Sequence, residues 1–283
     1  MTKSHEFTSP INNRFEIADS LLLHIPVPNM DRLLEQKQQY NMLAIDVTHP
    51  LYNEPLVSLE EYGIIGQSYY SRPNAATGEP VPGVDPAQYL RRSVAETLSK
   101  VNNTLSQPEI VEAFDGEIEL YVEDALRPVW LQQKLHDEVM PSLIREQQPN
   151  LSEAEVLEAR SHLIAKPSLD PSRPSPHATG GVFDLSLRYK ETGDPVNMGH
   201  VDADTLRVRP DYFEVHPPVD DDEVEAQKNR RVFYNILTGS AFTEPTGFVV
   251  NPTEWWHFGK GDQLSEKVRG SEAAYYTFPD RAE

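Results

Sequence analysis

The chain contains no cysteine, and this absence removes several kinds of chemistry at once. Without a thiol among its 283 residues, there can be no disulfide, no thiolate zinc site and no cysteine nucleophile. Any bound metal must therefore be held by histidine, aspartate or glutamate. The lack of cysteine suits a reducing or an oxidising compartment equally, so it does not decide the location.

Basic residues are also scarce. The chain has 25 lysines and arginines against 45 acidic residues, which gives a formal net charge of -20. Binding to nucleic acid phosphates requires clustered basic side chains, so this balance disfavours a nucleic acid partner. It equally disfavours an anionic membrane surface. We expect the partner to be a small or neutral substrate.

Long apolar runs are missing. No stretch approaches the roughly 20 apolar residues that a membrane span requires, and residues 1–20 lack the apolar segment of a secretory signal. The default expectation is a cytoplasmic protein that does not bind membranes. The length suits a single domain over residues 1–283, and an oligomer is compatible with the sequence.

The hydrophobic pattern predicts a mixture of separated strands and helices. Alternating apolar residues predict strands at 117–126 and 182–190, and short strands are expected at 41–52, 247–250 and 273–278. Apolar spacings of three and four predict helices at 87–105, 129–148, 152–165 and 223–242, the third with a capping box at Ser152 and Glu155. This mixture indicates an α+β fold with one main sheet covered by helices.

Ionisable residues gather in two short motifs, SPHATGGVFD and EWWHF. His177, Asp184 and His257 would give two imidazoles and one carboxylate, a suitable shell for a catalytic zinc with an open position for water. Glu254 lies three residues before His257 and is a candidate general base. Because residues three apart point to opposite faces of a flat strand, this segment must bend for the two side chains to converge.

Arg127 follows the strand expected at 117–126 and precedes Pro128, which restricts it to an extended conformation. Attack of water on an amide carbonyl creates an oxyanion. A fixed guanidinium aimed at that oxygen would stabilise the transition state more than the ground state. Arg127 is therefore a second candidate catalytic residue.

These motifs resemble those of the D-alanyl-D-alanine dipeptidases, including the vancomycin-resistance type, within the zinc DD-peptidases. The family pattern S-x-H-x-x-G-x-A-x-D is matched here except that Val182 replaces the small residue, and EWWH is matched fully. The segment ALRP resembles the part of the family that carries the arginine. The resemblance covers roughly residues 115–278, and residues 1–110 are less typical.

The resemblance implies a mainly antiparallel sheet covered by helices, of the hedgehog/DD-peptidase type. It implies one zinc ion per chain held by His177, Asp184 and His257, with Glu254 as base and acid and Arg127 at the oxyanion. The family holds the substrate ammonium with a serine and an acid, for which Ser175 and Asp202 are the candidates. Asp202 is offset by one residue from the family spacing, and Asp204 competes with it. The expected activity is hydrolysis of D-Ala-D-Ala or a close dipeptide by zinc-activated water, with cell-wall turnover as one of the possible settings.

Three other interpretations stay open from the residues alone. A zinc peptidase or amidase of the same fold could act on another dipeptide or a specialised metabolite. Two histidines and one carboxylate could also form the facial triad of a non-haem iron oxygenase, although those triads usually place a histidine and an acid two residues apart. A binding module without activity is the third, and the intact Glu254 and Arg127 argue against it.

Overall fold

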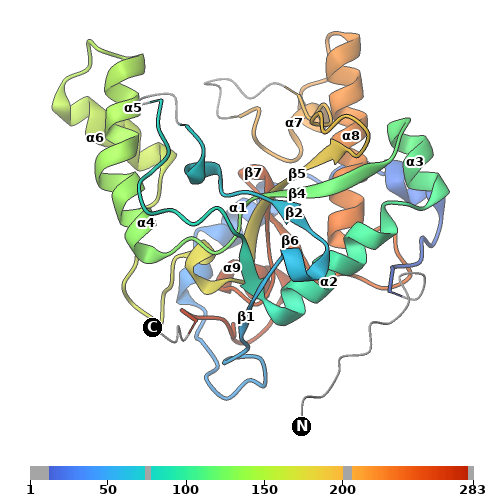
Figure 1. Cartoon of the computed structure of the whole chain (residues 1–283), viewed down its shortest axis with the longest axis horizontal. Coiled ribbons are helices and arrows are strands. Elements are labelled where there is room, and N and C mark those ends of the chain that lie inside the picture. Colours follow the sequence, from blue (N-terminus) through green and yellow to red (C-terminus); the bar gives the residue numbers. More distant parts are fainter. Residues whose placement is uncertain (1–12, 74–77, 200–205, 280–283) are drawn as a thin grey trace.

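A five-stranded sheet forms the centre of the protein in a computed structural model that describes residues 13–73, 78–199 and 206–279 (Figure 1). Its strand order is β2-β4-β5-β7-β6. The strands are β2 (Ile65–Gly66), β4 (Ile118–Asp124), β5 (Val182–Tyr189), β6 (Val249–Asn251) and β7 (Glu254–Gly259). Only β2 and β4 run parallel, and the other neighbours are antiparallel. The expected α+β fold with a mainly antiparallel sheet is therefore confirmed.

Helices cover this sheet, as the apolar spacing predicts. They are α1 (Asp31–Lys37), α2 (Arg92–Thr104), α3 (Pro108–Phe114), α4 (Val129–Lys134), α5 (Met140–Gln147), α6 (Glu153–Leu163), α7 (Tyr212–Val215), α8 (Asp221–Thr238) and α9 (Gln263–Arg269). A π-helical turn, Leu135–Val139, joins α4 to α5, and α6 begins with the expected capping box. In Figure 1, α4, α5 and α6 project together from one side of the sheet, and α8 stands on the other side.

The core lies where the inward faces of the strands meet α2 and α8. Leu120, Val122, Leu185 and Leu187 come from the two long strands, and all are fully buried. Alternation along β4 leaves every second residue partly exposed, which is the pattern of a strand with one face in the core. Beyond a register shift in β4, Asp124 pairs with Asp184 of β5, and Asp184 pairs in turn with β7.

The helix expected at 87–105 begins only at Arg92. Its first part is instead β3 (Tyr89–Arg91), which pairs antiparallel with β1 (Leu56–Ser58). Leu90 fits the helical spacing because it is buried, but a strand residue can be buried equally well. The pairing partner lies about thirty residues earlier in the chain, so local periodicity cannot reveal it.

Two other expected strands, at 41–52 and 273–278, do not form. The single ladder contact between them is an isolated bridge from Ile45 to Ala274. The Asp46 carboxylate accepts hydrogen bonds from the backbone N–H and the hydroxyl of Thr48 at 2.8 and 2.7 Å. Such a local side-chain turn competes with extension of a strand.

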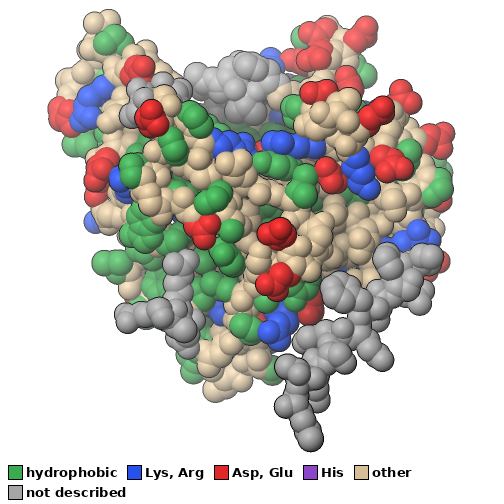
Figure 2. Space-filling model, viewed as in Figure 1, with side chains coloured by type: hydrophobic (Ala, Val, Ile, Leu, Met, Phe, Trp, Pro, Cys, Tyr) green, Lys and Arg blue, Asp and Glu red, His purple; other side chains and the backbone are tan. Residues whose placement is uncertain are grey.

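Acidic side chains gather at one side of the face shown in Figure 2, where α7 and the start of α8 lie in Figure 1. The run Asp220 to Glu225 belongs to this region, and Asp220 caps α8 by accepting a hydrogen bond from the Glu223 N–H. Within the described ranges, no helix is long and apolar enough to cross a membrane.

Candidate active site

Three acidic and basic positions align in one row across the central sheet. Asp124 is paired with Asp184 in the register of β4 and β5, and Asp184 is paired with His257 in β5 and β7. Residues paired directly across strands project from the same face, so these side chains emerge together. The register shifts between Val122 and Asp124, and such bulges commonly redirect side chains beside functional sites.

His177 reaches this row from a loop rather than from a strand. A short 3-10 helix, Pro176–Thr179, carries it, and Gly180 ends that helix with a φ of 71°. This left-handed conformation favours glycine, and a Cβ at Gly180 would also displace the end of the Leu56 side chain, whose Cδ2 lies 2.7 Å away. The tight turn lets the chain place His177 over the sheet and enter β5 at once.

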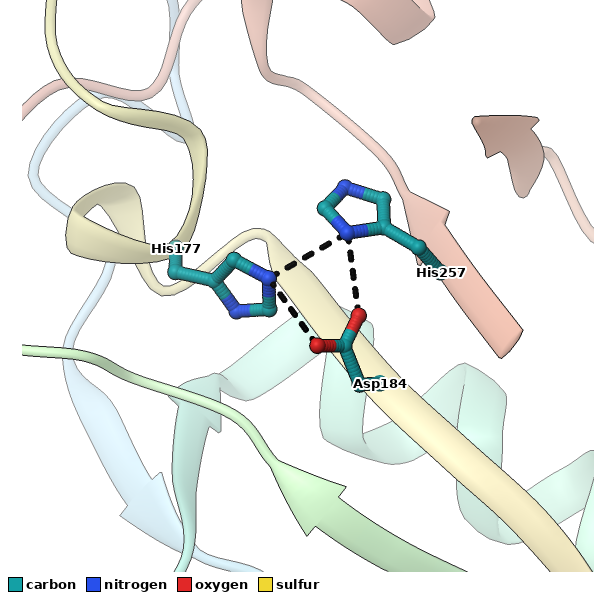
Figure 3. A group of neighbouring side chains, drawn as sticks. All are labelled: His177, Asp184 and His257. Atoms are coloured by element: carbon teal, nitrogen blue, oxygen red, sulfur yellow. Dashed lines mark hydrogen bonds and ion pairs between the residues drawn. The ribbon is translucent and has the colours of Figure 1, made fainter. Parts of the chain in front are cut away.

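The side chains of His177, Asp184 and His257 point toward one another (Figure 3). His177 Nε2 lies 3.4 Å from Asp184 Oδ2, and His257 Nδ1 lies 2.9 Å from Asp184 Oδ1. The two imidazole nitrogens are 3.2 Å apart. All of the candidate ligand atoms lie within 4.8 Å of one another. The structure therefore brings together the residues that the two motifs indicate.

The contacts of these residues fit a divalent metal ion. Asp184 Oδ1 is buried and has no hydrogen-bond partner. His177 Nδ1 lies 3.0 Å from the Ala125 carbonyl oxygen, which leaves Nε2 directed at the cluster. Histidine ligands typically have their second nitrogen fixed in this way. Two imidazoles and a carboxylate form a donor set that suits zinc.

Charge keeps the Asp184 carboxylate ready to bind a cation. Burial raises the pKa of Asp184, but the attraction of His177 and His257 outweighs it, and the pKa lies well below its usual value. Burial lowers the pKa of His177, but the attraction of Asp184 and Asp124 together outweighs it, and the pKa lies above its usual value. An ionised carboxylate is what metal coordination requires.

Arg127 borders the cluster and is held in place by its neighbours. Its Nε donates to Asp124 Oδ2 at 2.7 Å, and its Nη1 donates to Gln132 Oε1 at 2.7 Å. Its Nη2 lies 3.9 Å from Asp184 Oδ2, and the guanidinium stacks over Tyr70 at 5.1 Å. Burial lowers the pKa of Arg127, but Asp124, Tyr70 and Asp184 together outweigh it and raise the pKa above its usual value. The guanidinium therefore stays charged with a fixed direction.

Glu254 converges on His257, as the candidate base must. Its Oε2 lies 3.3 Å from His257 Nδ1 and accepts a hydrogen bond from Asn251 Nδ2 at 2.7 Å. The bend expected in this segment corresponds to a shift in the register of β6 and β7. The shift falls between Val250 and Asn251, and Asn251 pairs with Glu254 at the start of β7. The Glu254 side chain is 38% exposed, whereas that of Asp184 is 15% exposed. Glu254 is therefore the more open of the two carboxylates.

The two tryptophans of EWWH join this strand to the core. Trp255 packs edge-on against Phe233 of α8 with ring centroids 5.8 Å apart, and against Trp256 at 5.4 Å. Both indole rings are partly buried. Trp255 thus anchors the segment between Glu254 and His257 to α8, and Trp256 packs against Trp255.

The two candidate residues for the substrate ammonium differ in what can be said of them. Ser175 lies two residues before His177, is partly buried, and its hydroxyl accepts a hydrogen bond from the Ser168 N–H at 3.0 Å. It thus orders the proline-rich loop. Asp202 and its competitor Asp204 lie outside the described residues. The role of both candidates stays a prediction.

Several neighbours of the cluster escape the motif analysis. Asp124 lies three residues before Arg127 and is 4% exposed; its place in the alternation of Leu120 and Val122 puts an acid on the apolar face of the strand, which was an available signal. Gln132 sits one helical turn after Arg127 and bridges it to the Ala165 carbonyl oxygen at 2.7 Å. Asn251 lies three residues before Glu254, outside the second motif. Lys37 comes from α1, and nothing in the local sequence relates it to the site.

Two comparisons with known proteins agree with this geometry. A family model described as D-ala-D-ala dipeptidase matches residues 94–279. A D-alanyl-D-alanine dipeptidase of Synechocystis sp. (strain ATCC 27184 / PCC 6803 / Kazusa) is 32% identical over 221 residues, which is 75% of this chain and 83% of the relative. These matches place the chain among the metallopeptidases. Within that class, it belongs to the D-Ala-D-Ala dipeptidase family.

This membership decides between the interpretations that the residues left open. It supports hydrolysis by a peptidase over oxygen chemistry at a facial triad, and an enzyme over a binding module. The family match begins within α2, so β1, β2, β3 and α1 all precede it.

Proposed function

We propose that the chain is a zinc-dependent dipeptidase that hydrolyses D-Ala-D-Ala or a closely similar dipeptide. His177, Asp184 and His257 would hold one zinc ion per chain. The observation that carries this proposal is the convergence of their ligand atoms within 4.8 Å. The name of the Synechocystis relative, a D-alanyl-D-alanine dipeptidase, supports the substrate class.

Glu254 would act as the general base and then as the general acid. Zinc bound beside it supplies a Lewis acid that makes water nucleophilic near neutral pH. The Glu254 carboxylate lies next to His257 and remains partly exposed, so it can accept a proton from the attacking water. It would return that proton to the leaving amine, which must be protonated to depart.

Arg127 would stabilise the negative charge that develops on the substrate carbonyl oxygen. Its Nη2 lies 3.9 Å from the Asp184 carboxylate, which places the guanidinium at the edge of the cluster. Because Asp124 and Gln132 already fix its direction, it needs little rearrangement during the reaction. Preorganised donors of this kind contribute strongly to transition-state stabilisation.

Ser175 and Asp202 would bind the free ammonium of the dipeptide. The position of Ser175, two residues before His177, supports its part in this. A site that pairs a free ammonium should reject a substrate whose amine is blocked. A site that pairs the free carboxylate at the other end as well would accept a free dipeptide and reject a longer peptide.

Glu254→Ala should retain zinc and lose at least about a hundredfold in rate, the low end for removal of a general base. Zinc content and initial rates of D-Ala-D-Ala hydrolysis measure these effects. Glu244→Ala is the matched control, because Glu244 is 59% exposed and pairs with Lys100, and it should leave the rate unchanged. Full activity of Glu254→Ala would remove this residue from the mechanism.

The substrate class is tested with a panel of peptides and an assay of released amino groups. D-Ala-D-Ala should be cleaved, whereas N-acetyl-D-Ala-D-Ala and the tripeptide D-Ala-D-Ala-D-Ala should be cleaved poorly or not at all. Efficient cleavage of the blocked peptide would contradict recognition of a free ammonium. If only other dipeptides were cleaved, the proposed substrate would be wrong, but the proposal of a zinc peptidase would stand.

A further inference from the structure

A side chain from the amino-terminal part of the chain reaches the candidate general base. Lys37, the last residue of α1, donates from Nζ to Asn251 Oδ1 at 2.9 Å and to Thr253 Oγ1 at 2.7 Å. It lies 214 residues before Asn251 and outside the matched range 94–279. The contact therefore adds a feature to the site that the family match does not include.

The orientation of the Asn251 amide follows from its partners. Oδ1 faces the Lys37 ammonium and also receives the Thr253 backbone N–H at 3.2 Å. Both of these groups can only donate. The amide oxygen must therefore lie on that side, and the Nδ2 hydrogen must point to Glu254 Oε2, 2.7 Å away. The direction of each hydrogen bond is set without choosing between amide rotamers.

The Lys37 and Asn251 side chains are polar, and burying them costs free energy. Asn251 is 5% exposed, and burial lowers the pKa of Lys37 while the Glu254 charge opposes that shift. Among the described residues, Lys37 forms no direct ion pair with a carboxylate. Besides the charge interaction with Glu254, the Lys37 ammonium polarises the Asn251 amide that donates to Glu254.

We propose that Lys37 and Asn251 are positioning residues that hold the Glu254 carboxylate in the orientation it needs as general base. The hydrogen bond to Oε2 fixes the rotation of the carboxylate. Oε1 has no hydrogen bond to any described residue and stays available to take the proton from water. The inference rests on the role of Glu254 proposed above, and it deepens that role.

The substitution Asn251→Asp tests the positioning of Glu254 separately from any effect on folding. The aspartate keeps the size of the side chain and an oxygen for Lys37 and Thr253, but it replaces the donor to Glu254 with a second acceptor. Hydrogen bonds to charged groups are typically worth enough for about a tenfold to hundredfold effect. We expect kcat to fall by that factor, with KM, zinc content and Tm little changed.

A matched control is Asn103→Asp, because Asn103 Nδ2 donates to the Asn13 carbonyl oxygen at 3.2 Å far from the cluster. This variant should retain the kcat of the parent. Unchanged kcat in Asn251→Asp would overturn the proposal. A fall in kcat that is matched by the same fractional loss of zinc would also overturn it, as would one accompanied by a large fall in Tm. The effect would then be structural.

The role of Lys37 is tested with two substitutions, one of which is repeated in the Glu254→Ala variant. Lys37→Met should lower kcat about tenfold, and Lys37→Arg should restore most of it, because arginine supplies a charged donor. In the Glu254→Ala background, Lys37→Met should change the residual rate little, because the group that it positions is gone. A further tenfold fall in that background would contradict positioning. Lys100→Met, which removes an ion pair with Glu244, is the control for loss of a lysine.

The same variants distinguish this inference from the proposed function. If Glu254→Ala retains full activity, the base assignment fails and the positioning role fails with it. If Glu254→Ala is inactive while Asn251→Asp and Lys37→Met retain the parent kcat, the proposed function stands and the positioning role is wrong.

Discussion

At the scale of single residues, several contacts together fix the direction of the Arg127 guanidinium. Its guanidinium uses Nε and Nη2 on Asp124 and Nη1 on Gln132, and it stacks over Tyr70. A lysine ammonium cannot reproduce this planar set of donors. The specific geometry, rather than positive charge alone, is what the proposed oxyanion role requires.

Arg127→Met should therefore reduce kcat/KM for D-Ala-D-Ala by about a hundredfold to a thousandfold, the range for loss of one oxyanion donor, with zinc retained. Arg127→Lys should recover little of this loss. Steady-state kinetics with metal analysis provide the test, and Arg145→Met is the control, because Arg145 is 48% exposed and pairs with Glu153. Substantial activity in Arg127→Lys would show that charge suffices.

The residues that sequence could identify are those whose chemistry is unusual for their local setting. His177, Asp184, Glu254 and His257 occupy motifs with fixed spacing, and the structure brings them together. Gln132 and Lys37 are ordinary polar residues on helices. Their importance arises only from contacts made by the folded chain, so no local pattern could select them.

At the scale of secondary structure, two helices end in the same way with different surroundings. Gly239 ends α8 with a φ of 76°, and Gly270 ends α9 with a φ of 77°. A Cβ at Gly239 would lie 2.5 Å from the Thr246 N and 2.9 Å from Pro245 Cα, whereas one at Gly270 would meet nothing within 4 Å. The end of α8 thus packs directly against the segment that leads into β6.

Gly239→Ala should lower the free energy of unfolding by about 2 kcal/mol or more, because backbone strain and a backbone clash add together. Gly270→Ala carries only the strain and should cost about 1 kcal/mol. Denaturant unfolding of both variants measures the difference. Equal losses would show that the close approach at Gly239 has no energetic weight.

Sequence patterns predict elements well where one face is consistently apolar. The strands β4 and β5 and the helices α6 and α8 all have such a face or a clear cap. The pattern fails at β3, because its partner β1 is distant and a buried Leu90 fits either structure. It also fails at residues 41–52, where the Asp46 turn takes the place of a ladder.

At the scale of the whole molecule, the candidate site exists only because of the strand order. His177 and His257 are 80 residues apart. The strands β5 and β7 are neighbours in the sheet, although α8 and β6 lie between them in the sequence. The amino-terminal α1 then closes on the β6–β7 turn through Lys37. Composition and periodicity indicate the fold class, but the strand order depends on pairings between distant segments, which they do not encode.

Because the ligands meet only in the folded chain, metal binding and activity should depend on one shared site. The most direct test removes metal with a chelator, removes the chelator, and follows D-Ala-D-Ala hydrolysis as zinc is added back. The account predicts no hydrolysis without zinc and a linear recovery that ends at about one equivalent per chain. Hydrolysis that persists without metal, or a folded protein that zinc never activates, would contradict it.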